Sequence, residues 1–175
     1  LSFICNMSFY SELFTGTTLA FSQEQQRILT SLLLEGYQWI IWRGYWDVNA
    51  LNRQLFRNAD IDKGFSLLFA AHSLMKSSEP EVADQIKKMI LRNSSFSQVP
   101  NSFTGNKHFR ESDYTVHRTP TWLASVRMAS ERVIGTELVN EDNLKGYYMA
   151  DGALYTYVHG DEYHNIFPCT YVYNA

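Results

Sequence analysis

WLASVRMA, residues 122–129, changes character at every second position: Trp122, Ala124, Val126 and Met128 alternate with Leu123, Ser125, Arg127 and Ala129. A period of two places the two sets on opposite faces of a strand, so this stretch predicts a half-buried β-strand. Farther on, residues 147–149 and 153–158 flank Asp151 and Gly152, a dipeptide typical of a tight hairpin turn because glycine accepts positive φ. The second half of the chain is therefore predicted to be antiparallel β structure.

The first half has the spacing of helices. Ser22 and Gln25 form a capping-box pattern ahead of an apolar stripe of helical period. A second helix is predicted over residues 63–76. A third begins near Ser78, with Pro80 in its first turn and Glu81 placed to bond back to the cap.

Helices followed by strands, rather than alternating with them, predict an α+β chain with two segregated layers or two domains. Residues 93–112 are rich in Ser, Asn and Phe and show no sustained period, which is typical of a linker or a long surface loop. We therefore place a domain boundary near residue 100, dividing the chain into 1–100 and 101–175.

The bulk composition excludes several classes of protein. With 175 residues, 45% hydrophobic side chains and a net charge of −3, the chain is globular and lacks the basic field of a nucleic-acid binder. No apolar run is long enough to span a membrane, and residues at the N-terminus lack the basic, apolar and small-residue order of a signal peptide. Cys5 and Cys169 say little about redox compartment. Because the chain starts at Leu1, we expect an excerpt from a longer polypeptide.

The segment RGYWDVNALNRQLFRN, residues 43–58, concentrates arginine, asparagine and aromatic side chains. Arg53 and Arg57 are four positions apart, so a single helical turn would put both guanidinium groups on one side. Their planar forks suit carboxylate or sulfate, and Trp46 offers a ring on which a sugar stacks. The alternative is that the arginines are solvated or locally paired and that the tryptophans belong to the core.

Motifs of several enzyme classes are missing. The five histidines show no zinc spacing, and GxSxG, P-loop and GxGxxG patterns do not occur. His117 is expected to be a structural, hydrogen-bonded imidazole in a strand. No spacing in a sequence identifies the facing carboxylates of a glycosidase.

Three blocks together resemble polysaccharide lyase family 8, which contains chondroitin AC, hyaluronate and xanthan lyases. They are RGYWDVNALNRQLFR (43–57), SDYTVHRTPTWLASVRMASERV (112–133) and TELVNEDNLKGYYMADG (136–152). The continuation GDEYHNIFP (160–168) resembles the chondroitin AC lyase branch. The resemblance implies the C-terminal helices of an incomplete (α/α) toroid over 1–100, followed by the first strands of an antiparallel β-sandwich over 101–175.

The resemblance also implies a reaction, β-elimination on a uronic-acid polysaccharide such as chondroitin or hyaluronan, giving an unsaturated uronate. By similarity, Arg53 is the partner of a catalytic tyrosine and Glu137 holds that arginine. Four residues are expected to contact substrate: Arg57, Asn140, Trp46 and Asn49. No metal or cofactor is expected for the chemistry, and a structural calcium ion in the parent protein is compatible with the family.

The catalytic Asn, His and Tyr of the family precede the arginine pair, and this chain does not contain them. Tyr10 lies in MSFYSELF, which differs from the family's motif, and no histidine occurs before His72. We therefore expect the chain alone to be inactive and to depend on the remainder of its own polypeptide. The resemblance implies a secreted or periplasmic bacterial protein whose signal peptide lies outside this chain. The alternatives are a non-catalytic module that binds acidic polysaccharide and a hydrolytic glycosidase.

Overall fold

The computed structural model describes residues 1–94, 101–133 and 146–166, and it contains helices together with an antiparallel sheet. The chain divides into two compact units, described here one at a time. The helical unit comprises Leu1–Gly44 and Lys63–Val99, and the strand unit comprises Tyr45–Asp62 and Pro100–Ala175. Tyr45–Asp62 groups with the strands although it lies inside the predicted range 1–100. The assignment of 1–100 and 101–175 to two domains stays a prediction.

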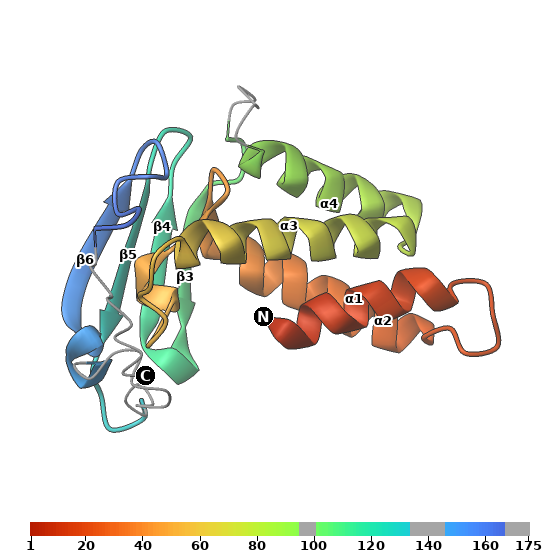
Figure 1. The fold of residues 1–175 in the computed structure, drawn as a ribbon, viewed down its shortest axis with the longest axis horizontal. Coiled ribbons are helices and arrows are strands. Elements are labelled where there is room, and N and C mark those ends of the chain that lie inside the picture. The colour runs from red at the N-terminus through yellow and green to blue at the C-terminus, as the bar shows by residue number, and fades with distance from the viewer. Residues whose placement is uncertain (95–100, 134–145, 167–175) are drawn as a thin grey trace, which may run out of the picture. The chain divides into compact units, whose positions relative to one another are not determined.

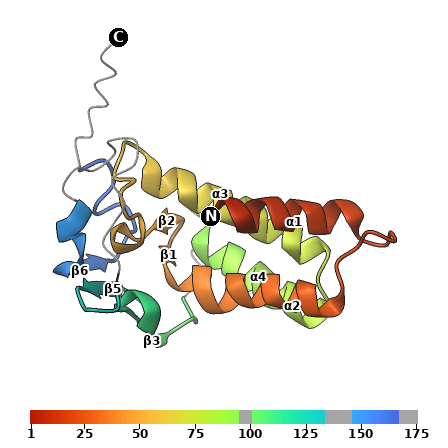
Figure 2. The ribbon, with the colours of Figure 1, turned by 90° about the horizontal axis from the view of Figure 1, so that it is seen from below.

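Four helices run roughly parallel to one another in both views of the molecule (Figures 1 and 2). They are α1 (Ser2–Phe14), α2 (Gln23–Ser31), α3 (Ala59–Lys76) and α4 (Pro80–Asn93). A π-helical turn, Leu32–Gly36, and a 3₁₀ turn, Tyr37–Trp39, follow α2. Fully buried apolar side chains fill the helical unit: Ile4, Leu33, Leu67, Leu74, Ile86 and Met89.

Polar contacts link three of these helices at one end. The Ser11 hydroxyl donates to Gln26 Oε1 at 2.7 Å, and Gln26 Nε2 donates to the Ser77 carbonyl at 3.1 Å. Lys76 pairs with Glu12 at 2.5 Å. These contacts tie α1 and α2 to the end of α3.

The helices predicted from the sequence are confirmed, with two corrections. Ser22 caps α2 through the predicted capping box with Gln25. α4 begins at Pro80, but its N-cap is Glu79 without a side-chain bond, because the Ser78 hydroxyl donates to the Leu74 carbonyl instead. α1 was not predicted, since it has neither a side-chain cap nor an acidic first turn.

The described residues of the strand unit form a four-stranded antiparallel sheet in the order β3–β4–β5–β6 (Figure 1). Its strands are β3 (Gly105–Phe109), β4 (Tyr114–Arg118), β5 (Leu123–Met128) and β6 (Asp151–Tyr157). Two-residue strands, β1 (Ile41–Trp42) and β2 (Tyr45–Trp46), flank the turn at Arg43 and Gly44. The loop predicted over 93–112 is wrong at β3, an edge strand with no fully buried side chain to mark its period.

The predicted strand over 122–129 is confirmed as β5, and its buried face is partly polar. Leu123, Ser125 and Arg127 are buried, whereas Trp122 and Met128 are 39% and 44% exposed. A polar buried face requires bonding partners, because an unpaired polar group away from water is unfavourable. Tyr45–Asp62 supplies several of those partners.

The hairpin predicted at Asp151 and Gly152 is wrong. Both residues lie in β6, and residues Gly146–Ala150 form a 3₁₀ helix instead of a strand. β5 and β6 shift register there, so that Arg127 faces two residues, Gly152 and Ala153. Gly152 has φ +85°, which a bulge uses as readily as a tight turn does.

Candidate functional site

Tyr45–Asp62 carries the predicted arginine pair and belongs to the strand unit. It comprises β2, a 3₁₀ turn at Val48–Ala50 and a stretch of turns that ends where α3 begins at Ala59. Arg53 and Arg57 lie within the turns, so the helical turn that would align them is absent from this segment. Arg57 is exposed and Arg53 is half-buried.

Two of the predicted substrate contacts lie in the interior. Trp46 is 4% exposed and Asn49 is 2% exposed. A sugar stacks on an aromatic ring only when one face of the ring is open, so burial of Trp46 supports the alternative that it is a core residue. Both side chains are buried, and their predicted contacts with substrate stay predictions.

Asn49 links the segment to the sheet. Its amide nitrogen donates to Ser125 Oγ at 3.0 Å and to the Ala153 carbonyl at 3.3 Å. Its side-chain oxygen has no hydrogen-bond partner among residues 1–94, 101–133 and 146–166. Ser125 belongs to the polar face of β5, and Ala153 lies at the bulge in β6.

Asp47 is the centre of a second link. This carboxylate is 1% exposed and accepts hydrogen bonds from the hydroxyl groups of Tyr114 and Tyr157, each at 2.7 Å. The Tyr157 hydroxyl in turn accepts the Val48 backbone N–H at 2.8 Å. The two tyrosines come from β4 and β6, so Asp47 joins the start of the segment to two strands.

The protonation of this cluster follows from its burial. Burial raises the pKa of Asp47, although hydrogen bonds from Tyr114, Tyr157 and Ser125 oppose the rise. Burial and the nearby Asp47 carboxylate raise the pKa of Tyr114 well above its usual range, and the same two causes raise the pKa of Tyr157. Both phenols therefore stay protonated at neutral pH and act as donors, not as general bases.

An asparagine with a left-handed backbone conformation precedes Arg53, and another follows Arg57. Asn52 has φ +55° and Asn58 has φ +64°. The Arg127 guanidinium donates from Nη1 to Asn52 Oδ1. Asn58 bonds reciprocally with Asn165: its N–H donates to Asn165 Oδ1 at 2.7 Å, and Asn165 Nδ2 donates to Asn58 Oδ1 at 2.9 Å.

The end of the segment makes a further contact with the 160–166 loop. His164 Nδ1 lies 3.0 Å from Asp60 Oδ1, and the Tyr45 ring meets the His164 ring edge-on at 5.6 Å. The loop itself is closed by Glu162, whose carboxylate accepts the backbone N–H groups of Val158, His159 and Gly160. This histidine and Asn165 are thereby presented to the segment from a structured loop.

Glu137 and Asn140 lie outside the described residues, and their predicted roles stay predictions. Cys169 lies outside them as well. His117, predicted to be structural, lies in β4 with its Nδ1 3.4 Å from Asn106 Nδ2. Within 1–94, 101–133 and 146–166, no group of three or more His, Cys, Asp or Glu side chains could hold a metal ion. No helix in those ranges is long and apolar enough to cross a membrane.

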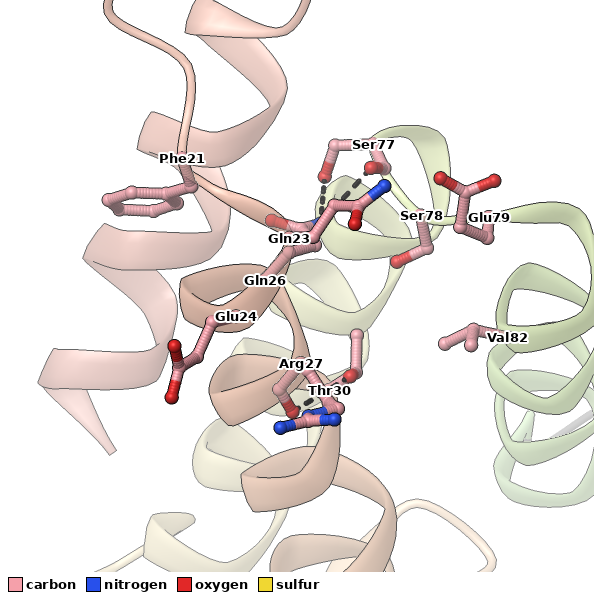
Figure 3. Close-up of a pocket in the computed structure, with 10 residues that line it drawn as sticks. All are labelled: Phe21, Gln23, Glu24, Gln26, Arg27, Thr30, Ser77, Ser78, Glu79 and Val82. Carbon is pink, nitrogen blue, oxygen red and sulfur yellow. Dashed lines mark hydrogen bonds between the residues drawn. The ribbon is translucent and has the colours of Figure 1, made fainter.

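A pocket of about 720 Å³ opens in the helical unit (Figure 3). Gln26, with its bonds to Ser77, lines it together with Arg27, Glu24 and Glu79. None of the predicted site residues lines this pocket. It combines both charge signs and therefore has no clear preference for an anionic ligand.

The residues that hold the segment could not be predicted from the sequence. Asp47, Arg127 and Asn165 have no spacing that marks them as partners of residues far away in the chain. One signal was present: an asparagine directly precedes Arg53 and another directly follows Arg57. Asparagine is enriched several-fold at positive φ, so the pair indicated two sharp changes of chain direction around the arginines.

A family model and several known proteins are similar in sequence to this chain. Residues 104–174 match the model of the polysaccharide lyase family 8 super-sandwich domain. Chondroitinase-AC of Pedobacter heparinus is 31% identical over 155 residues, which are 87% of this chain and 22% of that protein. A hyaluronate lyase of Enterococcus faecalis is 30% identical over 73 residues, 42% of this chain and 7% of that protein.

Solved structures with the same fold include those of two lyases. A chondroitinase AC lyase, whose oligosaccharide complexes reveal its active site, aligns with a TM-score of 0.78 at 25% identity, over 94% of this chain and 24% of its own. A Paenibacillus xanthan lyase aligns with a TM-score of 0.83 at 15% identity, over 94% of this chain and 19% of its own. The chain thus spans about a fifth to a quarter of the length of these proteins.

Proposed function

Because this chain belongs to polysaccharide lyase family 8, we propose that it is part of a lyase that cleaves a glycosaminoglycan by β-elimination. The substrate class is a uronic-acid polysaccharide, chondroitin or hyaluronan, and the product carries an unsaturated uronate. The observation that carries the proposal is the 31% identity to chondroitinase-AC over 87% of this chain. An alignment of that length within 175 residues includes the segment with the arginines.

The proposal includes the finer architecture and the location. The helices would be the last ones of an incomplete (α/α) toroid, and the strands would be the first of an antiparallel β-sandwich. The similarity to chondroitinase AC lyase over 94% of this chain supports that assignment. Acting on an extracellular polymer requires a secreted or periplasmic protein.

The chemistry explains why arginines would lie in this segment. The proton at C5 of a uronic acid becomes acidic enough to remove only when the charge that develops on the neighbouring carboxylate is stabilised. A tyrosine removes that proton in its ionised form, which a nearby guanidinium favours by lowering the phenol pKa. Arg53 would serve that tyrosine with Glu137 as its partner, and exposed Arg57 would contact the substrate with Asn140.

The tyrosine itself would come from the remainder of the polypeptide. Tyr114 and Tyr157 are excluded as the base, because both are buried donors to Asp47 and their pKa values are raised. Trp46 and Asn49 would help to hold the segment in place, since both side chains are buried. The acidic polysaccharide is the one external partner that this arrangement requires.

An elimination assay tests the proposal. The full-length polypeptide is incubated with chondroitin or hyaluronan, and the ultraviolet absorbance of the unsaturated uronate is followed. We expect product from the full-length protein and none from the 175-residue chain alone. Shortening of the polymer without a new double bond would indicate a hydrolase, and binding without cleavage would indicate a non-catalytic module; either result contradicts the proposal.

A further inference from the structure

The stretch NRQLFRN, residues 52–58, places each arginine next to an asparagine, and both asparagines have positive φ. We infer that Arg127 and Asn165 are positioning residues: they hold Asn52 and Asn58 and thereby set where Arg53 and Arg57 point. This inference rests on the proposed function of the two arginines. It adds side chains that the reaction itself does not require.

The first anchor holds the chain just before Arg53. Asn52 turns the backbone with φ +55°, and the Arg127 guanidinium donates to its side-chain oxygen. Arg127 is a buried residue of β5 at the β5–β6 bulge, so its guanidinium projects from a hydrogen-bonded strand rather than from a loop. A hydrogen bond from a charged donor is about twice as strong as a neutral one, which suits an anchor.

The second anchor holds the chain just after Arg57. Asn58 has φ +64°, and both its backbone N–H and its side-chain oxygen bond to the Asn165 amide. Two parallel bonds fix the direction of Asn58 as well as its distance. Asn165 is itself supported, because the loop before it closes on Glu162 and the adjacent His164 meets Asp60.

Anchoring matters because residues 53–57 form neither helix nor strand. A segment without a repeating hydrogen-bond pattern takes its position from the contacts at its ends. Displacing a catalytic group by about 1 Å can lower a rate by about 100-fold, so side chains that hold such a segment affect the reaction without touching the substrate.

Glycine substitutions separate the anchor from the backbone conformation. Asn52→Gly and Asn165→Gly keep the positive φ but remove the side-chain bonds. In the full-length lyase, we expect N52G to lower kcat about tenfold with little change in KM, since it acts through Arg53. We expect N165G to raise KM about tenfold, since it acts through Arg57. Asn58→Gly removes one of two bonds and should have a smaller effect than N165G.

Double-mutant cycles decide whether the anchors act through the arginines. N52G should cause no further loss in an Arg53→Ala background, and N165G none in an Arg57→Ala background. His159 is exposed and directly precedes the 160–166 loop, and His159→Ala keeps the backbone N–H that bonds to Glu162, so this variant should match the wild type. If an asparagine substitution instead causes the same loss in the arginine variant as in the wild type, and also lowers the melting temperature, the asparagine has a merely structural role and the inference is overturned.

The single arginine variants keep the two proposals distinguishable. If R53A and R57A lose activity while N52G and N165G behave like H159A, the inference fails and the proposed function stands. If R53A and R57A retain wild-type kinetics, the roles proposed for the arginines fail, and the inference that depends on them fails too.

Discussion

The hydroxyl of Tyr157 performs two tasks in the interior, and its removal is the sharpest test of how the segment is held. It donates to Asp47 and accepts the Val48 N–H, and Tyr157 and Asp47 are 2% and 1% exposed. In Tyr157→Phe the carboxylate loses a donor and the N–H loses its acceptor, without water to replace either. A hydrogen bond to a charged group contributes about 1.5–3 kcal/mol and a neutral one about 1 kcal/mol. The expected loss is therefore about 2.5–4 kcal/mol.

Tyr114→Phe and Tyr148→Phe complete the series. The Tyr114 hydroxyl donates one bond to Asp47, so Y114F should cost less than Y157F, about 2 kcal/mol. Tyr148 is 65% exposed, and Y148F should change little. The measurement is native-state hydrogen exchange of the Val48 amide in the full-length protein, which reports local opening even where unfolding is not two-state. Since 1.4 kcal/mol is a factor of ten, Y157F should accelerate exchange by roughly 60-fold to several hundred-fold.

The pH dependence gives an independent check on the same site. Burial raises the folded-state pKa of Asp47 because it disfavours the ionised carboxylate. The contribution of this side chain to stability is therefore fully present below its unfolded-state pKa and is lost as pH rises through its folded-state pKa. Removing the Tyr157 donor raises that pKa further, because its hydrogen bond favours the ionised form. The difference between Y157F and the wild type should therefore shrink in acid. Exchange at Val48 that is equal in Y157F and Y148F at neutral pH would refute the reasoning.

Other predictions concern the arginines, one turn and one loop. Arg53→Ala should lower kcat by about 100-fold or more, the effect of losing one preorganised electrostatic partner, and Arg57→Ala should mainly raise KM; steady-state kinetics would show either assignment to be wrong. Gly44→Ala should destabilise the protein by about 1–3 kcal/mol, since Gly44 has φ +88° and an added Cβ would lie 2.9 Å from the Asn93 carbonyl oxygen; an unchanged thermal unfolding curve would contradict this. Burial alone would raise the pKa of Glu162, but the backbone N–H groups that donate to its carboxylate outweigh burial, and the pKa is lowered. This carboxylate therefore stabilises its loop at pH values above the unfolded-state pKa of about 4.3. The stabilisation is lost as pH falls through the folded-state pKa. The protection factors of the amides of residues 158–160, which correct exchange rates for the intrinsic effect of pH, should fall in acid, and Glu162→Gln should abolish that pH step.

Local patterns were reliable where the interactions that form an element lie within it. The capping box of α2 and the period-two alternation of β5 were both read correctly, because each depends on residues a few positions apart. Asp151 and Gly152 failed as a hairpin for a related reason. The positive φ that glycine accepts serves a turn and a bulge equally, and the partner strand decides between them.

The sequence by itself determined that helices precede strands, the family resemblance and the arginine pair, because each is a property of neighbouring residues or of a motif. Tertiary structure alone decided that Tyr45–Asp62 joins the strand unit. It also decided that Trp46 and Asn49 face inward and that Asp47 meets tyrosines 67 and 110 positions away. The physical reason is desolvation: a buried carboxylate or amide needs partners wherever the fold provides them, and no local spacing specifies which strand that will be.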